Sequence, residues 1–292
     1  MSILVNKNTR LIVQGITGRQ GSFHARRMRQ DGTNIVGGVV PGKGGQNFEG
    51  IEIFDTVLET KLVKDANASI IFVPPKIASA SILEAIDAGI EVIVCITDGI
   101  PVHEMIEIKE RLKHENSWLI GPNTPGMITP EETKLGIMAL HAFKKGHIGI
   151  VTRSGSLTYE IAYELTRAGL GQSTVVGLGG DYIKGTDFID IIPLFEKDPD
   201  THLIVMVGEI GGTDEERTAE YIKDHCSKPY IAYLAGSSAP PDQQMGHAGA
   251  IVSQGRGTFK SKVEAFGKAG IPVARYPRDV KDIALDLLKS ER

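Results

Sequence analysis

A histidine with very small neighbours is the residue of this sequence that is best placed to do chemistry. The segment from Gly246 to Ala250 carries His247 among glycine and alanine residues, which are too small to shield the imidazole. Glycine permits backbone torsions and close approaches that other residues resist, so the ring can stand exposed on a tight loop. The pattern predicts a reactive histidine. A histidine that is only hydrogen-bonded within its loop is the alternative, because a short motif by itself does not separate the two.

Three further loops of the second half supply groups that suit phosphate chemistry. Arg153 to Ser156 stands between a predicted strand and a predicted helix, where hydroxyls, backbone amides and the positive end of a helix favour an anion. Gly177 to Asp181 follows the next strand and is nearly free of side chains. Glu209 follows the third strand, and its carboxylate can bond one nitrogen of His247 and so fix the tautomer of the ring. A surface glutamate or a helix-start residue is the alternative for Glu209.

A glycine-rich loop follows the first strand of the first half. Gly15, Gly18 and Gly21 permit a tight turn before a helix whose N-terminus favours phosphate, as in dinucleotide-binding folds. The spacing is G-x-x-G-x-x-G rather than G-x-G-x-x-G, and no acidic residue ends the second strand to hold a ribose hydroxyl. Lys43 lies there instead, in the loop from Val40 to Gly45, which suits a ligand with an additional phosphate, such as coenzyme A, better than NAD. A solvated loop lysine is the alternative.

Two small polar segments follow later strands of the first half. They are Cys95 to Pro101 and Gly121 to Gly126. Asn, Asp, Gly and Pro are favoured in turns for local reasons, so both segments can be simple turns. Their shared position after strands makes them candidate walls of a binding pocket.

Apolar, β-branched runs alternate with amphipathic stretches along the whole chain. Strands that are apolar on both faces and alternate with helices predict parallel, doubly wound sheets, in which ligands bind at the carboxyl ends of the strands. We therefore expect an α/β protein with a Rossmann-like domain over residues 1–125, a linker over 126–146 and a second doubly wound domain over 147–292. Gly32 and Gly89 are placed to end helices. The predicted strands are 11–14, 34–40, 69–73, 91–96, 118–121, 147–152, 173–178, 203–207, 229–234 and 272–275, and the predicted helices are 22–31, 79–88, 102–114, 157–168, 188–196, 214–225, 258–269 and 280–289.

Composition narrows the classes of protein that this sequence can encode. The 292 residues suffice for two domains of ordinary size, and 41% hydrophobic with 23% charged residues is typical of a globular protein. A net charge of -4 without a basic face argues against a nucleic-acid partner. No apolar run reaches the ~18 residues that span a bilayer, and the first ten residues lack the apolar core of a signal peptide. Cys95 and Cys226 suit reduced thiols. We therefore expect a cytoplasmic protein without a membrane partner.

These motifs, taken together and in this order, resemble the alpha subunits of succinate-CoA ligases, also called succinyl-CoA synthetases. The resemblance runs essentially from end to end. Several long motifs in one order are far more specific than any one of them. It rests on Gly15 to Gly21, Pro41 to Gly45, Gly121 to Asn123, Arg153 to Glu160, Gly208 to Gly212 and Met245 to Ile251.

The resemblance implies a fold and a set of site residues. The first domain would be a Rossmann-like domain that binds coenzyme A, and the second a flavodoxin-like ligase domain in which His247 is phosphorylated during turnover and Glu209 orients it. Ser154 and Gly155 would hold the phosphoryl group, and Tyr159 would lie near the acyl substrate at a subunit interface. The coenzyme site would be lined by Thr17, Gly18, Arg19, Gln20, Lys43, Ile96, Thr97 and Asp98.

The resemblance also implies a partner and a reaction. A beta subunit with an ATP-grasp domain and Mg2+ would pass the γ-phosphoryl group of ATP or GTP to His247. The phosphohistidine would then activate a small dicarboxylate as an acyl phosphate, and the coenzyme thiol would displace phosphate. This chain has no Walker loop and no evident ATP-grasp segment, so a partner is expected, as an alpha-beta or an alpha2-beta2 assembly. No metal site is expected in this chain.

Some positions depart from the family's usual pattern. The stretch from Ser237 to Gln244 carries no basic residue where the family usually has lysine and arginine, Thr124 and Tyr182 stand where cysteine and proline are usual, and Pro74 to Ile77 also differs. Less positive charge beside the histidine loop weakens attraction to phosphate or an acidic substrate, so we expect the acyl specificity or the docking of the partner to differ from a typical succinate enzyme.

Three alternatives stay open on the sequence alone. Within the same class, the acid is malate or another short acid instead of succinate. In a different class, the chain is an NAD(P)-dependent dehydrogenase, against which the missing acid after the second strand and the histidine loop both argue. In a third, it is a regulatory module that binds coenzyme A without catalysis.

Overall fold

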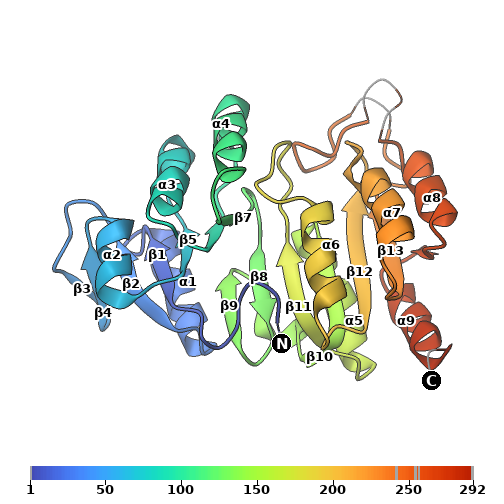
Figure 1. Cartoon of the computed structure of the whole chain (residues 1–292), viewed down its shortest axis with the longest axis horizontal. Coiled ribbons are helices and arrows are strands. Elements are labelled where there is room, and N and C mark those ends of the chain that lie inside the picture. Colours follow the sequence, from blue (N-terminus) through green and yellow to red (C-terminus); the bar gives the residue numbers. More distant parts are fainter. Residues whose placement is uncertain (1, 241–242, 253–254, 256, 291–292) are drawn as a thin grey trace. The chain divides into compact units, whose positions relative to one another are not determined.

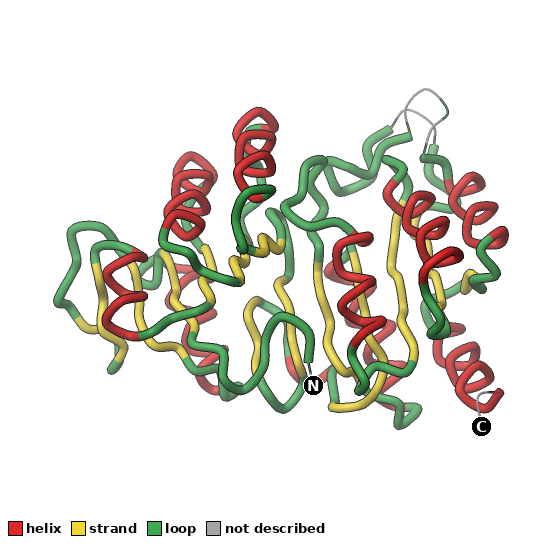
Figure 2. The backbone as a smooth tube through the Cα atoms, in the orientation of Figure 1, coloured by secondary structure: helices red, strands yellow, loops and turns green. Residues whose placement is uncertain are grey.

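The computed structural model describes residues 2–240, 243–252, 255 and 257–290 (Figures 1 and 2). Two compact units divide the chain. The N-terminal unit comprises Leu4–Met138 and Ile183–Thr186, and the C-terminal unit comprises the described residues of Met1–Ile3, Ala139–Tyr182 and Asp187–Arg292. Within the described ranges, no helix has the length and apolar character needed to cross a membrane.

The N-terminal unit is built on a sheet with the strand order β3-β4-β2-β1-β5-β6-β7. All neighbours are parallel except β3 and β4. The strands that follow β1 in the chain, β2 to β4, lie on one side of it, and β5 to β7 lie on the other side. The loops after β1 and β5 therefore flank the point where a doubly wound sheet binds its ligand. The strands are β1 (Leu11–Gln14), β2 (Ile35–Val39), β3 (Asn47–Phe48), β4 (Ile51–Phe54), β5 (Ala68–Ile71), β6 (Val92–Cys95) and β7 (Trp118–Ile120), and the helices are α1 (Arg19–Gln30), α2 (Val57–Lys64), α3 (Pro75–Asp87) and α4 (Val102–Leu112).

The predicted elements of this unit are present, and three others that precede residue 126 were not predicted. Gly32 and Gly89 follow the ends of α1 and α3 with φ of 90° and 68°, which confirms their role as C-terminal caps. Strands β3 and β4 and helix α2 were missed. The helix had a local signal, since the Thr56 side chain accepts a hydrogen bond from the Glu59 N–H at 3.1 Å, and these residues form the Thr-x-x-Glu pattern of a helix start.

Residues 126–146, expected to be a linker, are folded over most of their length. β8 (Gly126–Thr129) and β9 (Thr133–Gly136) form an antiparallel hairpin with buried strands in the N-terminal unit, before a 3-10 turn at Leu140–Ala142. The Thr33 hydroxyl donates to the Lys134 carbonyl at 2.8 Å, and the Lys134 ammonium pairs with Asp31. These contacts attach the hairpin to the end of α1, a tertiary effect that local composition does not report.

The C-terminal unit contains a second parallel sheet. Strands β14, β13, β12, β10 and β11 lie side by side in that order. Loops after β10, β11, β12 and β13 therefore begin at one edge, which is the predicted place for ligands (Figure 1). The strands are β10 (Lys145–Thr152), β11 (Gln172–Gly177), β12 (Leu203–Glu209), β13 (Tyr230–Ala235) and β14 (Val273–Ala274), and the helices are α5 (Gly155–Arg167), α6 (Phe188–Lys197), α7 (Asp214–His225), α8 (Phe259–Lys268) and α9 (Asp279–Ser290).

Apolar side chains explain why the C-terminal sheet is covered on both faces. Ile150 on β10 and Val205 on β12 are fully buried, as are Phe188 and Phe195 on α6 and Phe266 on α8. Strands that bury every residue cannot face water, so helices must cover both sides. The sheet provides the fixed frame from which the histidine loop and its neighbours extend.

Candidate functional site

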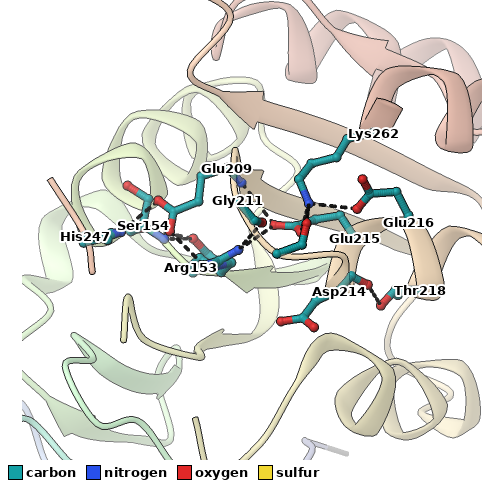
Figure 3. Close-up of polar contacts among 12 residues, drawn as sticks. Arg153, Ser154, Glu209, Gly211, Asp214, Glu215, Glu216, Thr218, His247 and Lys262 are labelled. Atoms are coloured by element: carbon teal, nitrogen blue, oxygen red, sulfur yellow. Dashed lines mark hydrogen bonds and ion pairs between the residues drawn. The ribbon is translucent and has the colours of Figure 1, made fainter. Parts of the chain in front are cut away.

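His247 and Glu209 lie in direct contact. The Nδ1 of His247 and the Oε2 of Glu209 are 2.8 Å apart, as Figure 3 shows. The carboxylate is 7% exposed and the imidazole 29% exposed, so the bond lies at the edge of the protein with one side of the ring open to solvent. A carboxylate on Nδ1 places the ring proton there, which leaves a lone pair on Nε2.

Three glycines shape the packing of the imidazole and its loop against the rest of the unit. A Cβ atom on Gly180 would lie 2.4 Å from the Cγ of His247, so only glycine leaves room for the ring. The Gly249 N–H donates to the Gly180 carbonyl at 3.2 Å, which ties the histidine loop to the loop after β11. Gly246 adopts a φ of 77°, a left-handed conformation that glycine takes without strain.

Arg153 contacts the oxygen of the Glu209 carboxylate that does not bond the histidine. Its Nη2 is 3.2 Å from the Oε1 of Glu209, and its Nη1 is 3.2 Å from the Oε1 of Glu215. Arg153 is buried, and a Cβ atom on Gly249 would lie 2.6 Å from its Nη2, so the guanidinium also underlies the histidine loop. The arginine therefore links the carboxylate that holds His247 to a second, fully buried carboxylate.

The charges around His247 set its protonation. The hydrogen bond that His247 donates to Glu209 raises the pKa of His247 above 6.5. Burial and Arg153 lower this pKa, and Asp181 adds to the rise. Burial opposes the charge of Arg153, but Glu215 and Glu209 hold its pKa above the ordinary value. The site thus keeps a charged arginine and a histidine whose protonated form persists to a higher pH than that of a free imidazole.

The predicted phosphate loop lies at the start of α5. The Ser154 side chain accepts a hydrogen bond from the Leu157 N–H at 3.4 Å and so caps the helix, and Gly155 is the first helical residue. The remaining N–H groups of the first turn present the positive end of the helix. Tyr159, one turn further, accepts a bond at its hydroxyl from the Ala139 N–H at 3.2 Å, and burial raises the pKa of this phenol.

The glycine loop of the N-terminal unit is tightly closed. A Cβ atom on Gly21 would lie 2.2 Å from the Gly15 carbonyl oxygen, and Gly15 has a φ of 78°. Gly18 is the N-cap of α1 and offers no side chain to that position, so the first N–H groups of the helix stay open to a ligand. Arg19 and Gln20, which are exposed, begin the helix and line a shallow surface pocket.

Two predicted coenzyme residues from different loops meet at this edge. The Lys43 ammonium donates to the Thr17 hydroxyl at 3.1 Å. Thr97 is less available, since its hydroxyl donates to the Val73 carbonyl at 2.6 Å and so fixes the loop after β6. Ile96 bonds through its N–H to the Ile71 carbonyl, and Asp98 is exposed.

Three residues of these sites had no role in the sequence analysis. Asp55, after β4, accepts a bond from the Gly44 N–H at 2.9 Å and holds the Lys43 loop. Glu215 and Lys262 are both 0% exposed and lie 2.5 Å apart at Oε2 and Nζ. Fully buried Glu and Lys are rare unless paired, but they look like ordinary helix residues in the sequence.

Of the stretch 237–244, which has no basic residue, Pro241 and Asp242 lie outside the described residues, and Gln243 and Gln244 are exposed. The described part of the chain contains no group of three or more His, Cys, Asp or Glu residues that could hold a metal ion.

Two family models match the two halves of the chain in order. A CoA binding domain matches residues 6–99, and a CoA-ligase domain matches residues 151–271. The chain is thus a two-domain α/β protein of the coenzyme A ligase class, with the glycine loop in the first domain and the histidine site in the second.

Curated relatives make the family more specific. The succinate-CoA ligase [ADP-forming] subunit alpha of Aquifex aeolicus is 54% identical over 99% of this chain and 95% of its own length. Subunit alpha 2 of Archaeoglobus fulgidus is 54% identical over 99% of this chain and 100% of its own, and the Staphylococcus epidermidis subunit is 47% identical over 99% and 96%. This chain belongs to the family of succinate-CoA ligase alpha subunits.

Solved structures share the fold at lower identity. The ATP citrate lyase of Methanothrix soehngenii, solved with citrate and coenzyme A, superposes with a TM-score of 0.88 at 24% identity, over 97% of this chain and 51% of that chain. The dinucleotide-forming acetyl-coenzyme A synthetase 1 of Ca. Korarchaeum cryptofilum gives 0.74 at 20% identity, over 94% and 60%. These likenesses show a common two-domain fold.

Proposed function

We propose that this chain is the alpha subunit of an NDP-forming succinate-CoA ligase, in which His247 carries a phosphoryl group. The observation that carries the mechanism is the contact of His247 Nδ1 with Glu209 at 2.8 Å. It leaves Nε2 as the nitrogen with a lone pair, on a side chain that is 29% exposed. Family membership, established by relatives at up to 54% identity, supports the same reaction.

The reaction has three balanced steps. His247 Nε2 attacks the γ-phosphorus of the nucleoside triphosphate, and the diphosphate leaves. A succinate carboxylate oxygen attacks the phosphorus of the phosphohistidine, which forms an acyl phosphate and returns the lone pair to Nε2. The coenzyme thiolate attacks the acyl carbon and expels inorganic phosphate, which leaves succinyl-CoA. Each transfer exchanges groups of similar reactivity, so the sequence is reversible.

Glu209 and the start of α5 have separate tasks in this scheme. Glu209 keeps the proton on Nδ1 and stabilises the positive charge that the ring acquires when Nε2 is phosphorylated. Ser154 and Gly155 lie where the N–H groups of a helix start favour the phosphoryl oxygens. We place Tyr159 near the acyl substrate, as the resemblance implies.

We assign coenzyme A, as a substrate, to residues 1–125, and the ligase chemistry to a flavodoxin-like domain over 147–292. The phosphates would lie on the N-terminus of α1, against Gly18, Arg19 and Gln20. Thr17 and Lys43, which bond each other, supply a hydroxyl and a cation beside that helix start. The loop formed by Ile96, Thr97 and Asp98 follows β6 at the same edge of the sheet and forms a further wall.

The chain works with a second, beta, subunit. We propose that this partner carries an ATP-grasp domain, binds Mg2+ with ATP or GTP, and assembles as an alpha-beta or alpha2-beta2 complex. Cys95 and Cys226 are not joined in a disulfide, which is in keeping with a reducing compartment, and we place the reaction in the cytoplasm.

One observation favours a second acid. The stretch 237–244 contains no basic residue, and its neighbour Met245 is exposed beside the histidine loop. Malate or another short acid is the second candidate, since fewer cations near the site weaken the attraction to any acidic substrate and leave the choice among short acids to other contacts.

A labelling experiment with a chase tests the function. The chain is purified with its beta subunit, incubated with γ-labelled ATP or GTP, and assayed for acid-labile label on His247, with His247→Asn as the unlabelled control. Coenzyme A is then added with succinate or with malate. Loss of the label on addition of succinate supports the proposal. Loss of the label with malate alone shows that malate, and not succinate, is the acid substrate. An intact complex that binds coenzyme A but takes no label from either nucleotide refutes the ligase mechanism.

A further inference from the structure

The strongest unassigned feature is a line of buried charges that begins at Glu209 and ends on α8. Figure 3 shows it passing from Glu209 to Arg153, then to Glu215 and Lys262. Glu216, which lies on α7 and is 21% exposed, is a second partner of Lys262, with an oxygen 2.8 Å from the Lys262 Nζ. These residues come from the loop after β10, the end of β12, the first turn of α7 and the body of α8.

The contacts of Arg153 are unequal, and this inequality decides which residue positions it. Its Nη1 donates hydrogen bonds to Glu215 at 3.2 Å and to the Gly211 carbonyl at 3.4 Å. Its contact with Glu209 is an ion pair without hydrogen-bond alignment, since the Oε1 of Glu209 forms no hydrogen bond among the described residues. The Glu215 carboxylate, not the Glu209 carboxylate, therefore anchors the guanidinium.

Lys262 in turn anchors Glu215. Its ammonium contacts Glu215 at 2.5 Å, and both side chains are 0% exposed. Lys262 also donates to the Gly212 carbonyl at 3.2 Å, so it holds the loop between β12 and α7 on which Glu209 and Glu215 depend. Burial disfavours the charge of Glu215, yet Arg153 and Lys262 together hold its pKa below the ordinary value, so the carboxylate remains charged.

We propose that Lys262 and Glu215 are positioning residues for the reactive histidine: they hold Arg153 against one oxygen of Glu209 and leave the other oxygen for His247. Neither touches His247. Both act through the guanidinium, and Glu215 also accepts a hydrogen bond from the Glu209 N–H at 3.2 Å, which helps to hold the backbone of Glu209. The helix-terminal acids of α7 have an ordinary explanation as partners of the helix dipole. That explanation does not require a fully buried acid, nor a fully buried lysine opposite it.

The arrangement predicts opposite effects for its two members. Without Lys262, Glu215 keeps Arg153 as its main partner and draws it from Glu209, so Glu209 acts more strongly on His247 and the ring stays protonated to a higher pH. Without the charge of Glu215, Arg153 turns fully to Glu209 and competes with the histidine, so the ring loses its proton at a lower pH. The charged groups that face His247 directly are Glu209, Arg153 and Asp181, and the experiment changes none of them.

The titration of His247 in the intact alpha-beta complex is the test, followed by NMR with labelled histidine and assigned by the signal lost in His247→Asn. This readout does not require turnover, so it stays informative even if the proposed ligase function, on which the inference rests, is wrong. Lys262→Met should move the midpoint to higher pH, Glu215→Gln to lower pH, and Lys262→Arg should restore the wild-type midpoint. At pH 7, Lys262→Met should also slow labelling of His247 about tenfold.

Two controls separate positioning from general damage. Lys260→Met removes a lysine from the same helix, but that side chain is 87% exposed, so neither titration nor labelling should change. The double variant Lys262→Met/Glu215→Gln removes both buried charges and keeps the experiment informative if Lys262→Met folds poorly. In the double variant, the titration midpoint of His247 should lie closer to that of the wild type than the midpoint of Lys262→Met does. If Lys262→Met does not fold, the comparison is with the midpoint of Glu215→Gln. Midpoints that move in the same direction in both single variants, or do not move in folded protein, overturn the proposal.

Discussion

The contact between His247 and Glu209 makes a quantitative prediction for Glu209→Gln. The glutamine carbonyl can still accept a hydrogen bond from the Nδ1–H of His247 in the same place, but it carries no charge. A hydrogen bond to a charged group contributes about 1.5–3 kcal/mol and a neutral one about 0.5–1.5 kcal/mol, so the reactive tautomer and the phosphorylated ring lose about 1–1.5 kcal/mol. Labelling of His247 at alkaline pH should therefore slow about 5- to 13-fold.

The same variant should change the pH dependence. Glu209 raises the pKa of His247 above 6.5, and the protonated ring has no lone pair on Nε2. The wild-type labelling rate should therefore fall as the pH drops through a midpoint above 6.5, and Glu209→Gln should move this midpoint to lower pH.

Single-turnover labelling with γ-labelled nucleotide and the beta subunit, stopped at short times across a range of pH, measures both effects. Glu220→Gln, an exposed change on α7, is the matched control. If Glu209→Gln labels at the wild-type rate with an unchanged midpoint, Glu209 does not orient the ring and the assignment of Nε2 loses its basis.

Three further predictions follow from close contacts. Gly180→Ala places a Cβ atom 2.4 Å from the imidazole and should slow labelling of His247 on the order of 100-fold through displacement of the ring. The control is Gly267→Ala, whose added Cβ would have no neighbour within 4 Å and should leave the labelling rate unchanged. If Gly180→Ala labels as fast as this control, the ring has room for the Cβ atom. Gly21→Ala places a Cβ atom 2.2 Å from the Gly15 carbonyl oxygen and should abolish coenzyme A binding in calorimetry, with a loss of about 1–3 kcal/mol in the free energy of unfolding; unchanged affinity would remove this loop from the coenzyme site. Glu196 accepts bonds from Ser227, Lys228 and Tyr230, which outweigh burial and hold its pKa below 4.5, so its contribution to stability is present above pH 4.5 and lost below it. Glu196→Gln should lower the free energy of unfolding in urea by about 1–2 kcal/mol at pH 7, with a difference that shrinks below pH 4.5; a difference independent of pH would contradict this.

The hairpin of β8 and β9 shows where local patterns fail. Its residues are buried because Thr33 and Asp31 bond Lys134, about a hundred positions away in the sequence. A segment whose partners are so distant has no periodicity of its own that predicts burial, and it resembles a linker. The same reason explains why β3 and β4 were missed, since short strands depend on their neighbours more than on their own residues.

The sequence by itself determined the class of fold, the order of the domains and the loops that are proposed to carry chemistry. Alternation of apolar strands and amphipathic helices is a local property, and parallel strands must bring their following loops to one edge, which is why Glu209 was correctly expected beside His247. The tertiary structure alone decided which charges stand behind that pair. Glu215 and Lys262 are separated by most of a helix, a strand and a long loop, and only the packing of α7 against α8 makes them a fully buried pair. Burial and partnership are properties of three-dimensional neighbours, so neither residue type nor spacing could report them.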